Sequence, residues 1–162
     1  MRIAMLTNNY RPFVGGVPIS VERQARELIK LGHGVTVFAP FYGDTRTERD
    51  KLLREDEMAP ETVVRYRIRR KKMDNGMVYP VLFPEEIIRA FENKTFDCIH
   101  VHHPMFVGPL GVKLGKRYAI PVIFTCHTRY EDYLHYIPAF RVNGNSLGVK
   151  KRAVEWIRTK AI

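Results

Sequence analysis

The sequence predicts an α/β fold, in which a Rossmann-like parallel sheet carries helices on both of its faces. Short apolar runs alternate along the chain with segments in which apolar residues recur at helical spacing. The runs are apolar at successive positions, as strands buried on both faces of a parallel sheet are. A chain of 162 residues, 45% of them hydrophobic, is long enough to bury a core. We therefore expect a single Rossmann-like domain over residues 1–162.

The first half of the chain is expected to alternate between strand and helix. The strands are expected at residues 3–7, 35–39 and 63–69. The last of them alternates arginines with apolar residues, as a strand near a sheet edge with one wet face does. Pro18 occupies the first turn of a helix that Gly32 closes. The charged residues 45–57 are expected to form a short helix on a long connection.

The second half continues the alternation. Helices are expected from Pro84 and over residues 109–118. Strands are expected at residues 96–101 and 121–126, both of them buried. The order of elements is therefore that of an open parallel sheet with helical crossovers.

Polar and glycine-rich segments follow three of the expected strands. These segments are residues 8–16, 102–108 and 127–133. Ligands of parallel α/β sheets bind at the carboxyl ends of the strands. The three loops are therefore expected to meet at one edge of the sheet, and that edge is the predicted site.

Gly15 and Gly16 stand between the first strand and the first helix. Two residues without side chains let backbone N–H groups approach a phosphate at a helix N-terminus. Neither the Gly-x-Gly-x-x-Gly fingerprint nor a Walker A loop is present, and Ala39-Pro40 stands where an NAD-binding enzyme places an acidic residue. On spacing alone the pair indicates either a phosphate site or a flexible turn.

The histidines and cysteines do not form a metal-binding pattern. His100 and His102 point the same way along a strand, with no cysteine or carboxylate ligand adjacent. Cys98 and Cys126 are expected inside apolar strands, where a free cysteine behaves as a small hydrophobe. We expect no metal, and histidines that are hydrogen-bonded at the strand end. Two cysteines are also too few for a disulfide scaffold, which favours a reducing cytoplasm.

Residues 127–133 are dense in chemically active side chains. His127 directly follows an expected strand, so it can donate a hydrogen bond or position a reacting hydroxyl. Arg129 can hold an anionic group, and Glu131 or Asp132 can accept a proton or orient a sugar hydroxyl. A polar loop with one capping aspartate is the alternative interpretation.

The formal net charge of +10 bears on partners rather than on the fold. Basic residues cluster on the expected strand at 63–69 and on the expected helix at 109–118. The candidate basic face consists of Arg65, Arg67, Arg69, Lys113, Lys116 and Arg117. Nucleic acid is not favoured, because no aromatic residues are interleaved with these clusters in a reader motif. An anionic membrane leaflet and a plain solvated surface stay open as interpretations.

Several segments resemble the retaining glycosyltransferases of family 4, which have the GT-B architecture. The first is Asn-Asn-Tyr-Arg-Pro-Phe-Val-Gly-Gly-Val at residues 8–17, and the helix after it ends in Leu-Gly-His-Gly-Val at 31–35. The others, in the order of the family, are His-His-Pro at 102–104, Ile-Pro-Val at 120–122 and His-Thr at 127–128. Residues 127–136 are most similar to the branch that glucosylates diacylglycerol. The likeness covers nearly the whole chain.

The resemblance implies two Rossmann-like domains, the N-terminal one for the acceptor and the C-terminal one for most of the nucleotide-sugar. It implies that Gly15 and Gly16 lie beside the donor diphosphate, and that His127 is the catalytic residue, meeting the donor sugar near the reacting carbon. The residues expected to bind the acceptor are Tyr10, His103, Arg129, Tyr130 and Asp132. The family works without a metal or a cofactor, and the expected donor is UDP-glucose.

The chain stops at Ile162 without the Glu-x7-Glu donor motif. We therefore expect the acceptor domain without its donor domain, inactive by itself. The expected function is transfer of a hexose, glucose being the expected one, to a membrane lipid such as diacylglycerol. The basic clusters would dock this peripheral, cytoplasmic domain on the inner face of the plasma membrane. The alternative is a non-catalytic basic module for anionic membrane or nucleic acid.

Overall fold

The computed structural model describes residues 1–72 and 78–127. The chain divides into two compact units, Met1–Thr125 and Cys126–Ile162, and the described helices and strands all belong to the first. They are β1 (Arg2–Leu6), α1 (Gly16–Lys30), β2 (Gly34–Pro40), α2 (Arg46–Glu57), β3 (Thr62–Tyr66), β4 (Ile68–Lys72), β5 (Val78–Pro80), α3 (Glu85–Asn93), β6 (Cys98–Val101), α4 (Val107–Tyr118) and β7 (Val122–Phe124). None of these helices is both long and apolar enough to cross a membrane.

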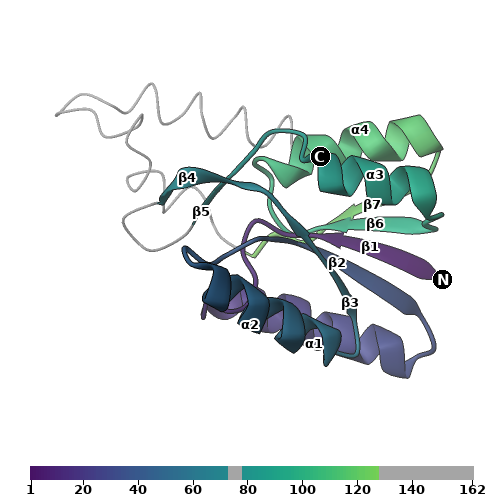
Figure 1. Ribbon diagram of the computed structural model, residues 1–162. Coiled ribbons are helices and arrows are strands. Elements are labelled where there is room, and N and C mark those ends of the chain that lie inside the picture. The colour runs from purple at the N-terminus through teal and green to yellow at the C-terminus, as the bar shows by residue number, and fades with distance from the viewer. Residues whose placement is uncertain (73–77, 128–162) are drawn as a thin grey trace, which may run out of the picture. The chain divides into compact units, whose positions relative to one another are not determined.

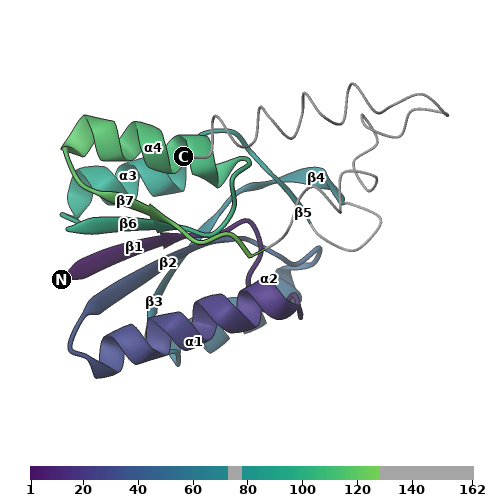
Figure 2. The ribbon, with the colours of Figure 1, turned by 180° about the vertical axis from the view of Figure 1, so that it is seen from behind.

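Five parallel strands form the main sheet in the order β3-β2-β1-β6-β7. Figures 1 and 2 show α1 and α2 on one face of this sheet and α3 and α4 on the other. The predicted α/β fold with helices on both faces is therefore confirmed. Strand order reverses between β1 and β6, and ligands of open α/β sheets bind at the carboxyl ends of the strands beside such a reversal.

The core lies on both sides of β1. Ile3 and Met5 pack with the buried face of α1, whereas Ala4 and Leu6 pack with α3 and α4. Because successive side chains of a strand point to opposite faces, both sets are buried and the strand is apolar at every one of these positions.

The charged segment before β3 is helical because its first turn is capped on both sides. The side-chain oxygen of Thr45 accepts a hydrogen bond from the Glu48 N–H over 3.2 Å, and the Glu48 carboxylate accepts one from the Thr45 N–H over 3.1 Å. This reciprocal pair satisfies two N–H groups that have no partner within the helix. The short helix expected within residues 45–57 is confirmed as α2, and it brings Asp56 into the protein interior.

The strand expected at residues 63–69 is divided in two. Its first part, β3, is the outermost strand of the main sheet, so the edge position is confirmed. Its second part, β4, pairs antiparallel with β5 in a separate two-stranded sheet. One continuous strand through residue 69 was therefore a wrong expectation, because the chain leaves the main sheet after Tyr66.

At the other edge of the main sheet, the strand expected at residues 121–126 is shorter and more exposed than predicted. β7 pairs with β6, and its Val122 and Ile123 side chains are 37% and 54% exposed. Cys126 lies beyond this strand and is exposed, whereas Cys98 is buried in β6 as expected. The buried position predicted for Cys126 is therefore wrong.

Candidate functional site

The loops after β1 and β6 meet at the carboxyl edge of the sheet. The backbone N–H of Asn8 donates a hydrogen bond to Nδ1 of His103 over 3.1 Å, and the Asn8 side-chain amide donates one to the Met105 carbonyl over 2.8 Å. From β3, the Tyr66 hydroxyl donates to the Thr7 carbonyl over 2.7 Å. Two of the three loops predicted to converge are therefore joined by direct bonds, with the predicted acceptor residue His103 between them.

Two of the described histidines at this edge, His100 and His103, form hydrogen bonds. His103 accepts a backbone N–H at Nδ1, so its ring proton is assigned to Nε2. Nε2 of His100 lies 2.7 Å from the hydroxyl of Thr125, and the His100 ring lies 4.1 Å from that of the fully buried His102. Hydrogen-bonded histidines were the expected arrangement, and metal independence stays a prediction.

Gly15 and Gly16 form the start of α1. Gly15 is its N-cap with extended backbone, and no side chain caps the helix. A Cβ on Gly16 would meet no atom within 4 Å, and one on Gly15 would lie 3.3 Å from Cε1 of Phe13. Neither packing nor a left-handed backbone requires glycine at position 16. The missing side chain leaves the N-terminus of α1 open, and a helix N-terminus attracts anions through its N–H groups and its dipole.

The loop between β1 and α1 is held from behind by β3. The Arg65 side chain is 3% exposed and forms a bidentate pair with Asp56 over 2.7 and 2.8 Å. Its Nη1 also donates to the carbonyls of Arg11, over 2.9 Å, and Pro40, over 3.0 Å. The place predicted for Arg65 on a membrane-facing basic surface is wrong, because its guanidinium is buried and used inside the protein.

Tyr10 belongs to the same internal network. It is fully buried, and its hydroxyl donates to Oε1 of Glu61 over 2.7 Å. Nη2 of Arg11 forms an ion pair with that oxygen over 2.8 Å, and the Arg11 guanidinium also pairs with Glu22 and Asp56. Burial, together with the hydrogen bond to Glu61, raises the pKa of Tyr10. Tyr10 was predicted to bind the acceptor, which is wrong for this structure because its side chain does not reach the surface.

The other predicted basic residues do not form one uniform face. Arg67 pairs with Glu85 over 2.9 Å and with Glu86 over 2.8 Å, and Arg117 lies 3.8 Å from Glu92. The remaining members of the predicted basic face are exposed, and they are Arg69, Lys113 and Lys116. Two of the cations are thus balanced by neighbouring carboxylates at the surface.

The predicted catalytic residue lies in the second unit. Burial lowers the pKa of His127, which favours the neutral imidazole at pH 7. Arg129, Tyr130 and Asp132 lie outside the described residues. The roles of these four residues, and the convergence of their loop with the other two, stay predictions.

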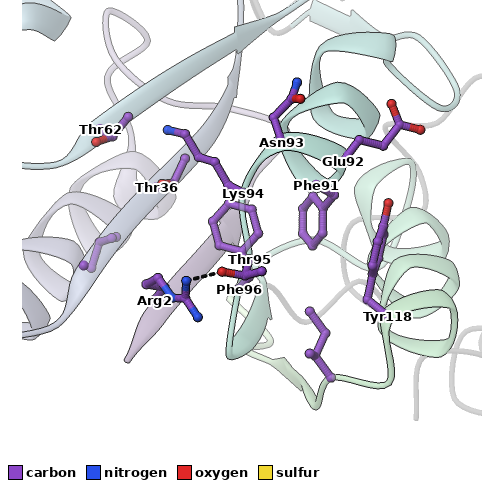
Figure 3. Close-up of a pocket in the computed structure, with 13 residues that line it drawn as sticks. Arg2, Thr36, Thr62, Phe91, Glu92, Asn93, Lys94, Thr95, Phe96 and Tyr118 are labelled. Atoms are coloured by element: carbon purple, nitrogen blue, oxygen red, sulfur yellow. Dashed lines mark hydrogen bonds between the residues drawn. The ribbon is translucent and has the colours of Figure 1, made fainter.

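A hollow of about 630 Å³ lies at the opposite, amino edge of the sheet. Figure 3 shows Arg2, Thr36 and Thr62 on one side of it and the rings of Phe91 and Tyr118 on the other. No motif of the sequence indicates this hollow, because separate elements contribute single residues to it. We place the candidate site at the carboxyl edge instead, where the open helix N-terminus and the joined loops lie.

The family model for Glycosyltransferase Family 4 matches residues 14–161. The chain belongs to Glycosyltransferase Family 4. The matched range includes the glycine pair at the start of α1, the His103 loop and the segment that begins at His127. The predicted family is therefore confirmed.

Similar proteins include two that are named alpha-monoglucosyldiacylglycerol synthase. The one from Acholeplasma laidlawii is 31% identical over 137 residues, which cover 85% of this chain and 32% of that protein. The one from Streptococcus pneumoniae is 33% identical over 139 residues, covering 85% of this chain and 29% of that protein. A GDP-mannose-dependent alpha-mannosyltransferase from Mycobacterium tuberculosis is 25% identical over 129 residues, which cover 79% of this chain and 32% of that protein. The chain thus spans about a third of the length of these relatives.

Proposed function

We propose that this family 4 chain is the acceptor-binding part of an enzyme that transfers glucose from UDP-glucose to diacylglycerol. Two relatives named alpha-monoglucosyldiacylglycerol synthase support the choice of sugar and acceptor. The enzyme would act as a peripheral protein on the inner face of the plasma membrane, where its acceptor resides. The chain alone is inactive in this proposal, because most of the donor contacts come from a second domain.

The observation that carries the proposal is the open N-terminus of α1. Nothing packs where a Cβ of Gly16 would stand, so a diphosphate can approach the first N–H groups of the helix. These groups stabilise the negative charge that develops on the diphosphate as it leaves the sugar. In this role the glycine is kept for the ligand and not for the fold.

The histidines have separate roles in the proposed reaction. His103 is held by Asn8 with its ring proton on Nε2, a donor suited to orienting an acceptor hydroxyl. His127 has a lowered pKa, which favours a neutral imidazole at the position proposed beside the reacting carbon. Arg129, Tyr130 and Asp132 complete the proposed acceptor contacts.

A chimaera tests the proposal directly. This chain replaces the matching third of the Acholeplasma laidlawii relative, and transfer of labelled glucose from UDP-glucose to diacylglycerol is measured. Gly16→Ala should lower kcat/KM at least tenfold, because the new methyl group occupies the proposed diphosphate position. Gly34→Ala is the matched control, since its Cβ would make an ordinary contact of 3.8 Å with Arg2 at the other edge of the sheet.

Three results would each contradict a part of the proposal. A chimaera that folds but transfers no glucose to diacylglycerol would exclude the substrate assignment. Equal kcat/KM for the Gly16→Ala and Gly34→Ala chimaeras would exclude a diphosphate at the N-terminus of α1. Transfer by the 162-residue chain alone would contradict the need for a second domain.

The non-catalytic basic module has less support. Arg65 is buried, and Arg67 and Arg117 lie beside surface carboxylates, so half of the predicted basic face is balanced or hidden. An exposed, unbalanced field of cations is what such a module needs. The glycosyltransferase assignment does not depend on this surface.

A further inference from the structure

Leu82 and Phe83 form an exposed apolar pair in the loop that leads into α3. Their exposed fractions are 58% and 47%. Among the described residues, Phe83 is the one exposed aromatic side chain. Adjacent exposed apolar side chains form a contiguous patch, which is the kind of feature that marks an interaction site.

The backbone at Phe83 has a conformation that is unfavourable for this residue type. Phe83 has a φ of 56°, in the left-handed region that bulky residues rarely occupy. It also precedes Pro84, and a residue before proline favours extended backbone. Such conformations persist where the surrounding structure enforces them, and they are common at functional sites. Here the buried Pro84, which caps α3, fixes one end of the loop.

A lysine of α4 lies against the pair, and a second follows on the same helix. Nζ of Lys113 lies 4.7 Å from the centroid of the Phe83 ring, and Lys116 follows one helical turn later. The views of Figures 1 and 2 agree that α3 and α4 lie side by side. The nearest acidic residues of α3, Glu85 and Glu86, already pair with Arg67, which leaves the lysine charges uncompensated by them.

We propose that Leu82, Phe83, Lys113 and Lys116 form a membrane-docking tip whose partner is an anionic lipid surface. The apolar pair enters the boundary between headgroups and acyl chains while the lysines lie among the anionic headgroups. This inference rests on the proposed lipid acceptor, and it keeps only Lys113 and Lys116 from the basic face expected from the sequence. Arg65 has no part in it, and the aromatic residue has the central role.

Co-sedimentation of the chain with vesicles tests the tip. The vesicles consist of phosphatidylcholine, with or without phosphatidylglycerol at about a third of the lipid. Each kind is prepared with and without diacylglycerol. Phe83→Gly should weaken the partition coefficient about tenfold or more, because it removes the aromatic group that the proposal places in the membrane. The same variant should unfold at an equal or higher temperature, since glycine accepts the backbone of position 83. Lys113→Gln should weaken binding about fivefold, on anionic vesicles alone.

Leu31→Ser is the matched control, because Leu31 is a 72% exposed apolar residue at the far end of α1. It should leave vesicle binding unchanged. No binding of the original chain to anionic vesicles, or equal binding by Phe83→Gly, would overturn the tip. Self-association that Phe83→Gly abolishes, without vesicle binding, would assign the pair to a second copy and overturn it too. Vesicle binding that does not depend on diacylglycerol would still support the membrane-docking tip. The identity of the acceptor would then rest on the glucose-transfer assay alone.

Discussion

Nδ1 of His103 accepts the backbone N–H of Asn8 over 3.1 Å, which joins the chain after β6 to the chain after β1. The bond lies beside the point where strand order reverses, so a shift of one loop is passed to the other. It also fixes the protonation of the ring, because a nitrogen that accepts a backbone N–H carries no proton. The chemistry that His103 offers is thus set by a backbone group of another loop.

The first prediction concerns this tautomer. Nitrogen-15 NMR of the histidine rings at pH 8 should show His103 with its proton on Nε2, because Nδ1 is occupied as an acceptor. Replacement of Asn8 by proline removes the donor and should release the ring to a mixture of tautomers. A His103 signal typical of a protonated Nδ1 in the original chain would contradict the assignment.

The second prediction concerns the buried arginine of β3. Arg65→Met should lower the free energy of unfolding by about 3–5 kcal/mol, because Asp56 is left as a buried charge without its bidentate partner. Urea denaturation measures the change. Arg69→Met, at an exposed position of β4, should change it by less than about 0.5 kcal/mol. Equal effects of the two substitutions would show that Arg65 is not buried as described.

The third prediction concerns the contact of α4 with the sheet. A Cβ on Gly111 would lie 2.5 Å from Cγ2 of Val101, so Gly111→Ala forces the helix and β6 apart. The expected loss of unfolding free energy is about 1–3 kcal/mol. Val101→Ala in the same chain should restore part of it, because it removes the methyl group in conflict. A double variant that is as unstable as the sum of the single variants would contradict the clash.

The fourth prediction concerns alkaline pH. Burial raises the pKa of Tyr42 to about 12, whereas its ordinary value is 10.0. The folded chain therefore holds this proton more tightly, and the stability linked to it is complete below pH 10 and is lost as pH rises toward 12. Urea midpoints measured over this range should fall less steeply for Tyr42→Phe. Identical slopes for the two chains would show that Tyr42 ionises alike in both states.

The layered fold could be predicted because its signals are local. The buried strands are apolar at successive positions. Helix α2 is preceded by its N-cap Thr45, which forms a capping pair with Glu48 three residues later. Strand β3 shows the limit of such signals. Its alternation separates two faces of the strand. It does not distinguish a solvent-exposed arginine from the buried Arg65, whose carboxylate partner lies nine positions earlier.

The place of a candidate residue in the fold was predictable only where one short segment determines it, as at the glycine pair, whose role stays a prediction. The position of the Gly15-Gly16 pair at the start of a helix could be predicted, because a strand, a loop and a helix follow one another in the sequence. Tyr10 was misjudged because its partner, Glu61, lies 51 positions away in a charged stretch that resembles solvated surface. The exposure of Phe83 depends on a left-handed backbone before a proline, which propensities disfavour and tertiary packing imposes.

Strand β3 has β2 as its neighbour in the main sheet and lies at the outer edge. From this edge, Arg65 donates a hydrogen bond to the Arg11 carbonyl and Tyr66 donates one to the Thr7 carbonyl. Both carbonyls lie on the segment that leads to the glycine pair. Outer strands fray at lower free-energy cost than central ones. Gentle warming should therefore loosen the glycine loop while the inner strands are still intact, so the loop should become mobile before the domain melts. Substitutions that strengthen this outer strand should therefore protect the glycine loop against heat more than substitutions in the core.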